Sequence, residues 1–280
     1  NSLSEDRSVA MMNPLSSDLN VLRQTLLFSG LETIAYNQNR KNSDLKLYEF
    51  GKTYIAIKGE ITKYIETKHL SVFITGRKHE ESWNASNDGM NFYTLKGIVK
   101  NIIERLGIKD VKLAELNSDL PIGQAGTFSQ GLAYNWNKKL LVEFGEIAKP
   151  ISSKLMDIKM PVYHADFNWD LILEAMKKSS TVYEEVPKFP EVRRDLALLI
   201  DKAIQFEALE QLAYQAEKNI LKDVNLFDVY QGDKLPNGKK SYALSFILQD
   251  ENATLTDKQI EKIMEKLMKT YQEKVGAEIR

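Results

Sequence analysis

The clearest pattern of hydrophobic and polar positions lies in the last third of the chain, where two segments alternate with a period of two. Such alternation is typical of a β-strand with one buried face, because successive side chains point to opposite sides. In the first segment one face carries Leu196, Leu198 and Ile200, and the other carries Arg193, Asp195, Ala197 and Leu199. In the second segment one face carries Tyr242, Leu244, Phe246 and Leu248, and the other carries Ser241, Ala243, Ser245 and Ile247.

Two helical patterns accompany these strands. One apolar stripe runs through Leu209, Leu212, Ala213, Ala216 and Ile220, and a second through Ile260, Ile263, Met264, Leu267, Met268, Tyr271 and Val275. Thr256 and Gln259 match a capping box, and Gly276 can end the second helix. With a strand at 224–230 and a short one at the end of the chain, the order is β-α-β-β-α-β. The sequence therefore predicts a ferredoxin-like domain over residues 187–280.

The middle of the chain is rich in strands and poor in helices. Strand patterns, with β-branched and aromatic residues, occupy 45–54, 69–76, 111–116, 131–136, 140–147 and 161–167, and one helical pattern occupies 93–106. Consecutive strands with few helices favour an antiparallel sheet with segregated helices. We expect an α+β protein whose first domain spans residues 1–186.

A leucine-rich segment precedes these strands. Leu15, Leu19, Leu22, Leu26 and Leu27 recur at helical spacing. Ser16 or Ser17 can cap the start of a helix there, and Gly30 can end it. Two readings stay open: the helix packs on its own domain, or it presents Arg23 and its leucines to a partner subunit.

Composition and charge narrow the classes of protein. Apolar residues make up 43% of the 280 residues and charged residues 28%, as in a globular protein. The net charge of -1 excludes a globally basic nucleic-acid binder, so any RNA contact must come from a local patch. The absence of cysteine excludes disulfides and thiolate zinc sites and fits a cytoplasmic location. We expect no membrane span, and the first residue, Asn1, suggests a piece of a longer polypeptide.

No catalytic constellation is readable in residues 1–186. The three histidines lack metal-ligand spacing, no glycine-rich phosphate loop follows a strand, and no G-x-S-x-G turn occurs. Glu49, Glu143 and Glu146 lie in strands, where carboxylates are more often solvated or ion-paired than catalytic. Lys96 and Gly97, at a helix start, could hold an anion, but a surface lysine is the simpler account. We therefore expect no catalytic residue and no metal site.

The ferredoxin-like domain leaves one side of its sheet uncovered, because two amphipathic helices can cover only one face of four strands. Serines and an alanine on that side suit a surface that a partner approaches closely, and RNA is a natural partner for such a sheet. The segment SYALSF lacks the aromatic signature of the common RNA-recognition motif, so RNA would bind in another mode.

Specific motifs carry a resemblance to a known family. PKFPEVRRDLAL, LFDVYQG, GKKSYALSF and TLTDKQI, with GAEIR at the end, resemble the ferredoxin-like anticodon-binding domain of the bacterial phenylalanyl-tRNA synthetase β chain. NPLSSDLNVLRQTLL, YEFGK and FYTLKGIVKNIIERLG resemble stretches of the catalytic-like module of the same chain. The resemblance covers nearly the whole sequence, as the C-terminal portion of a much longer β chain.

This resemblance implies more than the patterns do. The first domain would be a degenerate, non-catalytic class II synthetase fold, with catalysis in a separate α chain of an α2β2 enzyme that uses ATP and Mg²⁺ to join phenylalanine to its tRNA. The leucine-rich segment would contact the α chain through Asn13, Pro14, Leu15, Leu19, Leu22 and Arg23. Two family motifs are weakened, at 121–126 and 145–150, which puts a polar role for those loops in doubt.

The residues expected to contact the anticodon arm of phenylalanine tRNA are Arg193, Arg194, Lys239 and Lys240, for phosphates, and Tyr230, for stacking on a base. Each of the four basic residues could instead be a solvated surface charge, and Tyr230 could be an ordinary half-buried tyrosine. Two rival functions remain: a structural scaffold for the α chain without tRNA contact, and an independent small-molecule enzyme, for which no convergent carboxylates or histidines are readable.

Overall fold

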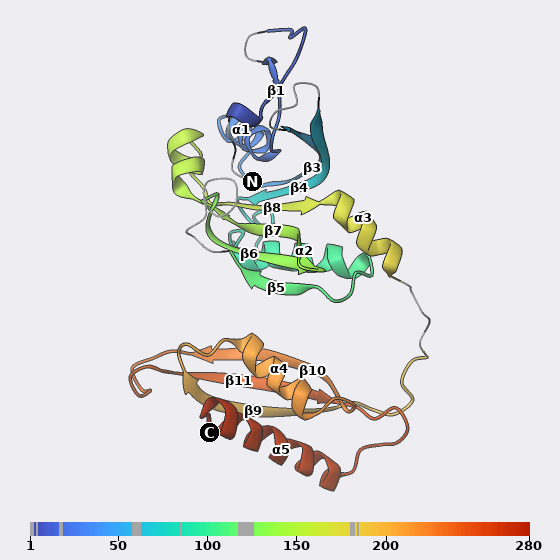
Figure 1. Cartoon of the computed structure of the whole chain (residues 1–280). Coiled ribbons are helices and arrows are strands. Elements are labelled where there is room, and N and C mark those ends of the chain that lie inside the picture. Colours follow the sequence, from blue (N-terminus) through green and yellow to red (C-terminus); the bar gives the residue numbers. More distant parts are fainter. Residues whose placement is uncertain are drawn as a thin grey trace. The chain divides into compact units, whose positions relative to one another are not determined.

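The computed structural model describes residues 3, 5–16, 19–57, 63–84, 86–116, 126–179, 183 and 185–280. The chain divides into two compact units, Asn1–Val182 and Tyr183–Arg280. Figure 1 shows the elements of each unit along the chain. Among the described residues, no helix is long and apolar enough to cross a membrane.

A six-stranded antiparallel sheet forms the first unit, in the order β3-β4-β8-β7-β6-β5. The strands are β3 (Leu45–Ala56), β4 (Tyr64–Thr75), β5 (Lys112–Glu115), β6 (Phe128–Trp136), β7 (Lys139–Ile147) and β8 (Val162–Asn168). The prediction of an antiparallel α+β fold is confirmed. β4 begins five residues earlier than its apolar pattern, because its first half, which includes Glu66 and Lys68, pairs with β3 at the exposed end of the hairpin.

Two helices cover one face of this sheet. α2 (Phe92–Arg105) packs Leu95, Val99 and Ile103 into a cluster with alternate residues of β4, β7 and β8, and α3 (Trp169–Lys178) adds Leu171, Ile172 and Ala175. Asn91 and Asn168 begin the two helices, because their side-chain oxygens accept the N–H groups of Thr94 and Leu171. α3 was not predicted from the sequence, although Leu171, Ile172 and Ala175 recur at helical spacing after Asn168.

The opposite face is covered by a single long helix, α1 (Leu27–Gln38), and only at one end. Its Leu27, Leu31 and Ile34 pack against Phe73, Phe128 and Val162. Two short helices also lie in this unit: a 3-10 helix at Glu5–Arg7 and a π-helix at Pro150–Leu155. No helix of the described residues covers the remainder of this face.

The predicted helix over the leucine-rich segment is wrong. Residues 20–26 form no helix; Val21–Leu22 form strand β2, which pairs with β1 (Val9–Ala10). α1 begins only at Leu27, whose N–H donates to the Thr25 hydroxyl at 3.1 Å. A helix formed by these leucines would have no surface of its own unit to pack against, because Leu15 and Leu19 are 94% and 61% exposed. A short helix without a buried apolar stripe is unstable in water. Ser17 lies outside the described residues, and Gly30 lies within α1 rather than at its end.

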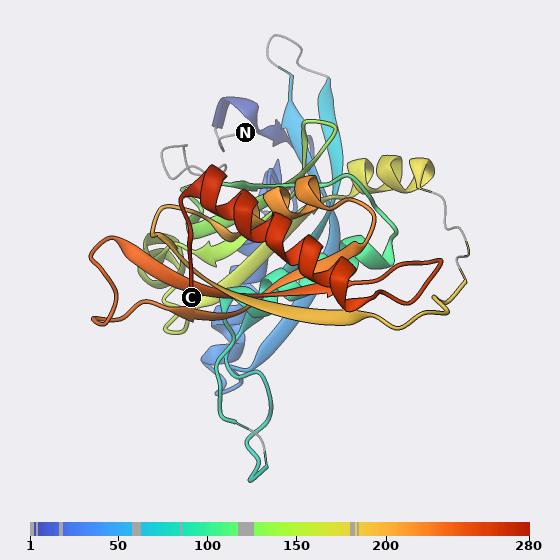
Figure 2. The same ribbon diagram turned by 90° about the horizontal axis from the view of Figure 1, so that it is seen from below.

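The second unit has the predicted ferredoxin-like order. It consists of β9 (Val192–Asp201), α4 (Phe206–Ala216), β10 (Leu221–Tyr230), β11 (Lys239–Leu248), α5 (Asp257–Val275) and β12 (Glu278–Ile279). The antiparallel sheet has the order β10-β11-β9-β12. Figure 2 shows α4 and α5 on one side of it, where they bury the apolar faces of β9 and β11.

Helix α5 is fixed at both ends and at its centre. The N–H of Thr256 donates to Gln259 Oε1 at 2.9 Å, as the capping box predicts, and Gly276 ends the helix with a φ of 61°. The fully buried Tyr271 donates its hydroxyl to the Leu209 carbonyl of α4 at 3.1 Å. This bond ties the two helices together above the sheet.

The position of Gly30 within α1 gives a stability prediction. A Cβ on Gly30 would overlap the ring of Phe73, whereas a Cβ on Gly97, inside α2, would meet no atom. We expect Gly30→Ala to lower the free energy of unfolding by roughly 1–3 kcal/mol through overpacking. Gly97→Ala, the matched control, should raise it by about 1 kcal/mol through helix propensity. Urea unfolding of both variants tests this, and a stabilising Gly30→Ala would contradict the described packing of α1 on Phe73.

Candidate nucleic-acid interface and polar cavity

The open side of the second sheet carries a mixed surface of small, aromatic and charged side chains. Ser241, Ala243 and Ser245 of β11 lie in register with Leu199, Ala197 and Asp195 of β9. The guanidinium of Arg193 lies over the ring of Phe227, with 5.2 Å to the ring centroid, although β11 separates their strands. The small residues of β11 make this contact possible.

Phe227 was not identified from the sequence, and a β-bulge explains its position. The pairing of β10 with β11 shifts between Leu226 and Asp228, so that Phe227 is the extra residue. Beyond the bulge, Tyr230 pairs with Ser241 and therefore lies on the open side, where strict alternation would have placed it with Val224 and Leu226 in the core. Phe227 and Tyr230 are 49% and 42% exposed, and a side chain on Gly232 would overlap the Tyr230 ring.

Two of the four predicted basic residues lie on this open side. Arg193 is paired with Asp195, with Nε to Oδ1 at 2.8 Å, so its charge is locally balanced. Lys239 pairs with Asp201 in register and shares its side of β11 with Ser241. The surface is therefore not strongly basic.

The other two basic residues lie on the helix-covered side. Lys240 is only 5% exposed, and its Nζ donates to the Tyr242 hydroxyl at 2.8 Å. This burial argues against a phosphate contact by Lys240, because the amine already has a partner inside the domain. Arg194 pairs with Phe246, a core residue, and is exposed at the end of its strand, where its Nη1 donates to the Arg193 carbonyl. The structure thus does not bring Arg194 and Lys240 together with Arg193 and Lys239.

The segment predicted to face a partner subunit exposes apolar side chains. Besides Leu15 and Leu19, the residues Met11, Met12 and Val21 are exposed. Asn13 and Pro14 lie in the loop between β1 and β2, and Leu22 is part of β2. Arg23 holds this segment to β3, because its Nη1 lies 2.7 Å from Glu49 Oε1 and its Nε donates to the Lys52 carbonyl. Arg23 is therefore occupied within the unit.

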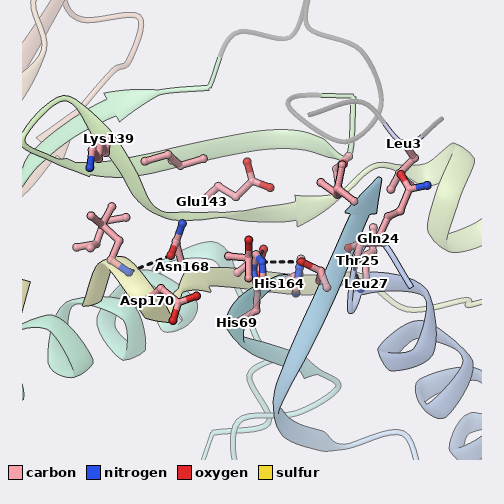
Figure 3. A pocket seen from close by; sticks show the side chains of 18 of the residues that line it. Leu3, Gln24, Thr25, Leu27, His69, Lys139, Glu143, His164, Asn168 and Asp170 are labelled. Atoms are coloured by element: carbon pink, nitrogen blue, oxygen red, sulfur yellow. Dashed lines mark hydrogen bonds and ion pairs between the residues drawn. The ribbon is translucent and has the colours of Figure 1, made fainter. Parts of the chain in front are cut away.

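The open part of the first sheet contains a cavity of about 670 Å³, which Figure 3 shows from close by. Its polar lining comes from four strands: Thr53 on β3, Thr67 and His69 on β4, Glu143 on β7, and His164, Asp166 and Asn168 on β8. Gln24, Thr25 and Leu27 close it from the start of α1, and Asp170 and Glu174 from α3. The sequence did not reveal this cluster, because its residues are far apart in the chain; His69 and Asp166 at its centre are separated by 97 positions.

His69 connects the strands at the centre of the cavity. Its Nδ1 lies 2.9 Å from Asp166 Oδ2, and its Nε2 lies 3.1 Å from the Thr53 hydroxyl. Hydroxyl, imidazole and carboxylate in this order resemble an activated nucleophile. Thr53, however, is 4% exposed in the middle of β3, so a substrate carbonyl has no approach to it. The arrangement instead fixes the ring of His69.

Two groups in the cavity have altered protonation. Burial raises the pKa of Glu143 from 4.5 to about 8, and the neighbouring charge of Asp166 adds to this shift. Burial lowers the pKa of His164, whose Nδ1 donates to the Val72 carbonyl and whose ring stacks on Phe73. At neutral pH, His164 is therefore uncharged and Glu143 is largely protonated.

The cavity does not suit ATP with Mg²⁺. Of the described lining residues, Lys139 is the one Lys or Arg, and it already faces Glu174 at 4.0 Å. The acidic side chains would repel a triphosphate. Among the described residues, no three His, Cys, Asp or Glu side chains form a group that could hold a metal ion. Of the two weakened family motifs, residues 121–125 lie outside the described part of the chain.

Comparisons with known proteins agree with these two units. The family description "Phenylalanyl tRNA synthetase beta chain CLM domain" matches residues 1–169, and "Ferredoxin-fold anticodon binding domain" matches residues 187–280. The chain belongs to the phenylalanyl-tRNA synthetase beta chain family. The resemblance seen in the sequence is thereby confirmed.

Relatives in this family are phenylalanine–tRNA ligase beta subunits. The protein of Bacteroides fragilis is 46% identical over 97% of this chain, that of Porphyromonas gingivalis 39% over 98%, and that of Clostridium acetobutylicum 34% over 97%. The matches cover 33%, 34% and 32% of those proteins, so the chain spans about a third of the length of the curated relatives it matches. A pyrrolysyl-tRNA synthetase structure from Desulfitobacterium hafniense has a TM-score of 0.45 at 13% identity, covering 62% of this chain and 54% of that one, which is too weak to carry an argument.

The raised pKa of Glu143 gives a prediction for stability against pH. The unfolded carboxyl ionises near pH 4.5, whereas the folded one stays protonated up to about pH 8. The folded state binds more protons in this window, so stability falls as pH rises from 4.5 to 8. Glu143→Gln should remove this loss and gain roughly 2–4 kcal/mol at pH 8.5, with little change at pH 4.5.

Urea unfolding at the two pH values measures this difference. Glu146→Gln is the matched control, because Glu146 lies on the same strand but on the side that faces α2. A gain at pH 8.5 no larger than that of Glu146→Gln would show that Glu143 ionises normally in the folded protein.

Proposed function

We propose that this chain is the part of a phenylalanine–tRNA ligase beta subunit that binds the anticodon arm of phenylalanine tRNA and assembles with the catalytic alpha subunit. The observation that carries the proposal is the open side of the sheet in residues 187–280, within a domain that belongs to the anticodon-binding family. In the whole enzyme, an α2β2 complex in the cytoplasm, the alpha subunit would use ATP and Mg²⁺ to join phenylalanine to the tRNA. Residues 1–186 would be a class II synthetase-like domain without catalysis.

The open side offers two kinds of contact to a single-stranded loop. Phe227 and Tyr230 are partly exposed aromatic residues, and bases stack on such rings without sequence preference. Ser241, Ala243 and Ser245 leave room between them for a base to approach the strand. Lys239 and Arg193 supply positive charge for the backbone, with Arg193 partly balanced by Asp195. Because the charge is sparse, stacking and shape would contribute more than electrostatics.

Assembly would use the exposed apolar segment at the start of the chain. Met11, Met12, Leu15, Leu19 and Val21 lie together in sequence and are exposed, which is typical of a surface that another subunit covers. The segment would contact the alpha subunit as a loop and a short hairpin rather than as a helix. Asn13, Pro14 and Leu22 belong to the same segment, and Arg23 would hold it against β3.

Titration with the anticodon stem-loop of phenylalanine tRNA tests the RNA contact. We expect the double variant Arg193→Ala/Lys239→Ala to weaken binding about three- to tenfold at moderate salt. Each lost phosphate contact should also reduce the slope of log affinity against log salt by about 0.7. Lys258→Ala/Lys262→Ala, which removes two exposed charges from α5 on the other side, is the control and should change neither. No binding by the unmodified chain at low salt would favour the scaffold function instead.

Co-purification with the alpha subunit from the same organism tests assembly. We expect Leu15→Ser/Leu19→Ser to weaken the complex at least tenfold, because both side chains would lose apolar contact with the partner. Leu155→Ser, at another exposed leucine, should leave the complex intact. Unchanged assembly of the double variant would place the alpha-subunit interface elsewhere on the first unit.

A further inference from the structure

The sequence contains a single Asn-Gly pair, Asn237-Gly238, in the turn that joins β10 to β11 (Figure 1). The proposed function gives this pair no part. In such a pair the asparagine side chain is open to attack by the next backbone nitrogen, because glycine has no side chain to hinder the approach. The question is whether the structure leaves this reaction free to occur.

The reaction begins at the backbone nitrogen of Gly238. After losing its proton, this nitrogen attacks Cγ of Asn237. A new C–N bond forms, the bond from Cγ to the side-chain nitrogen breaks, and ammonia leaves a five-membered cyclic imide. Water then opens the ring at either carbonyl and gives aspartate or isoaspartate. The net change exchanges an amide and water for a carboxylate and ammonium, without oxidation or reduction.

Both reacting groups are accessible in the folded unit. Asn237 and Gly238 are exposed, and a Cβ on Gly238 would meet no atom within 4 Å. No described residue forms a hydrogen bond with the Asn237 side chain or with the Gly238 N–H. Water therefore reaches the pair directly, and no hydrogen bond to a described residue has to break before the nitrogen attacks.

The turn is held at its ends, and its central peptide is free to rotate. The Lys239 N–H donates to the Pro236 carbonyl at 3.1 Å, and the Lys202 N–H donates to the Gly238 carbonyl at 2.9 Å. Gly238 has a φ of 82°, as at the third position of a type II turn. Because glycine also accepts a negative φ, the peptide between Asn237 and Gly238 can flip to the type I arrangement. This flip carries the Gly238 nitrogen past the Asn237 side chain.

A second susceptible pair, Asp88-Gly89, shows what protection requires. The Asp88 carboxylate accepts the Ser86 hydroxyl at 2.7 Å, and the Asp88 carbonyl accepts the Lys78 N–H at 2.9 Å. Gly89 also forms a β-bridge with Arg77. The side chain and the backbone are both restrained there, so the structure favours reaction at Asn237 over reaction at Asp88.

We propose that Asn237 is a site of spontaneous covalent modification, at which the side-chain amide is converted to an aspartate or isoaspartate carboxylate. The isoaspartate form would be a substrate for an enzyme that methylates isoaspartyl carboxylates. The modification itself is independent of the proposed tRNA and alpha-subunit contacts.

The product alters the start of β11 in two ways. It adds a negative charge two residues before Lys239. Isoaspartate also routes the main chain through Cβ, and the longer backbone cannot keep the geometry of the bond from Lys239 to Pro236. A carboxylate beside Lys239 repels a phosphate, so we expect weaker binding of the anticodon stem-loop, an effect that rests on the proposed function.

Peptide mapping of the full 280-residue chain during incubation at 37 °C tests the modification. The peptide with Asn237 should gain the mass of an amide-to-acid exchange and accept a labelled methyl group from an isoaspartyl methyltransferase. We expect conversion at least tenfold faster than at Asn137, which is exposed in the turn between β6 and β7 but is followed by Lys138. Conversion should be faster at pH 8 than at pH 6, because the attacking nitrogen must lose its proton.

The sites and the variants decide between outcomes. Conversion at Asn237 that is absent from Asn237→Gln supports the proposal. Conversion no faster than at Asn137, or more isoaspartate at position 88 than at position 237, overturns it.

Titration with the anticodon stem-loop separates the modification from its effect. Asn237→Asp supplies the carboxylate without incubation and should weaken binding about two- to threefold, whereas Asn237→Gln should leave it unchanged. Equal binding by the two variants would contradict the effect on RNA. If the unmodified chain does not bind the stem-loop, the proposed function fails, and peptide mapping still decides the modification.

Discussion

Both sheets of this protein are subject to one constraint: each has two faces, and the helices cover only one of them fully. In the second unit α4 and α5 bury one side of β9 and β11, and the other side stays open. In the first unit α2 and α3 cover one face, and α1 covers one end of the other through its contacts with Phe73 and Val162. The positions of both candidate sites depend on this incomplete coverage.

The uncovered faces of the two sheets differ in chemistry, because different side chains occupy the positions that are apolar on the covered faces. On the second sheet, small and aromatic side chains are interleaved and exposed, which suits a flat partner such as a base. On the first sheet, carboxyl, imidazole and hydroxyl groups converge below the level of the surface. Burial gives these groups unusual protonation, as with Glu143 and His164. The same β architecture thus supports two kinds of recognition.

Much of this fold could be predicted from the sequence, and the failures have physical causes. Alternation in β9 and β11 and the capping box of α5 are local signals, and they predicted these elements correctly. The leucine spacing before Leu27 was also local, but a helix there had no surface to bury its stripe. Lys240 was assigned from its charge alone, although its parity with Tyr242 already placed it on the buried side. The cavity around His69 and Asp166 was not predictable, because only the order of the strands brings these residues together.

The bulge at Phe227 has a consequence for comparing relatives of this chain. Because one residue is unpaired there, residues 228–230 at the end of β10 are offset by one position from the alternation of residues 223–226. A relative that lacks this residue would keep its tyrosine on the open side, because the tyrosine would then follow Leu226 by three positions. A relative that has the residue but pairs it regularly would turn the same tyrosine toward the core. Sequence identity in β10 is therefore a poor guide to which side chains meet solvent, and alignments of this strand need the gap placed within it rather than in the following turn.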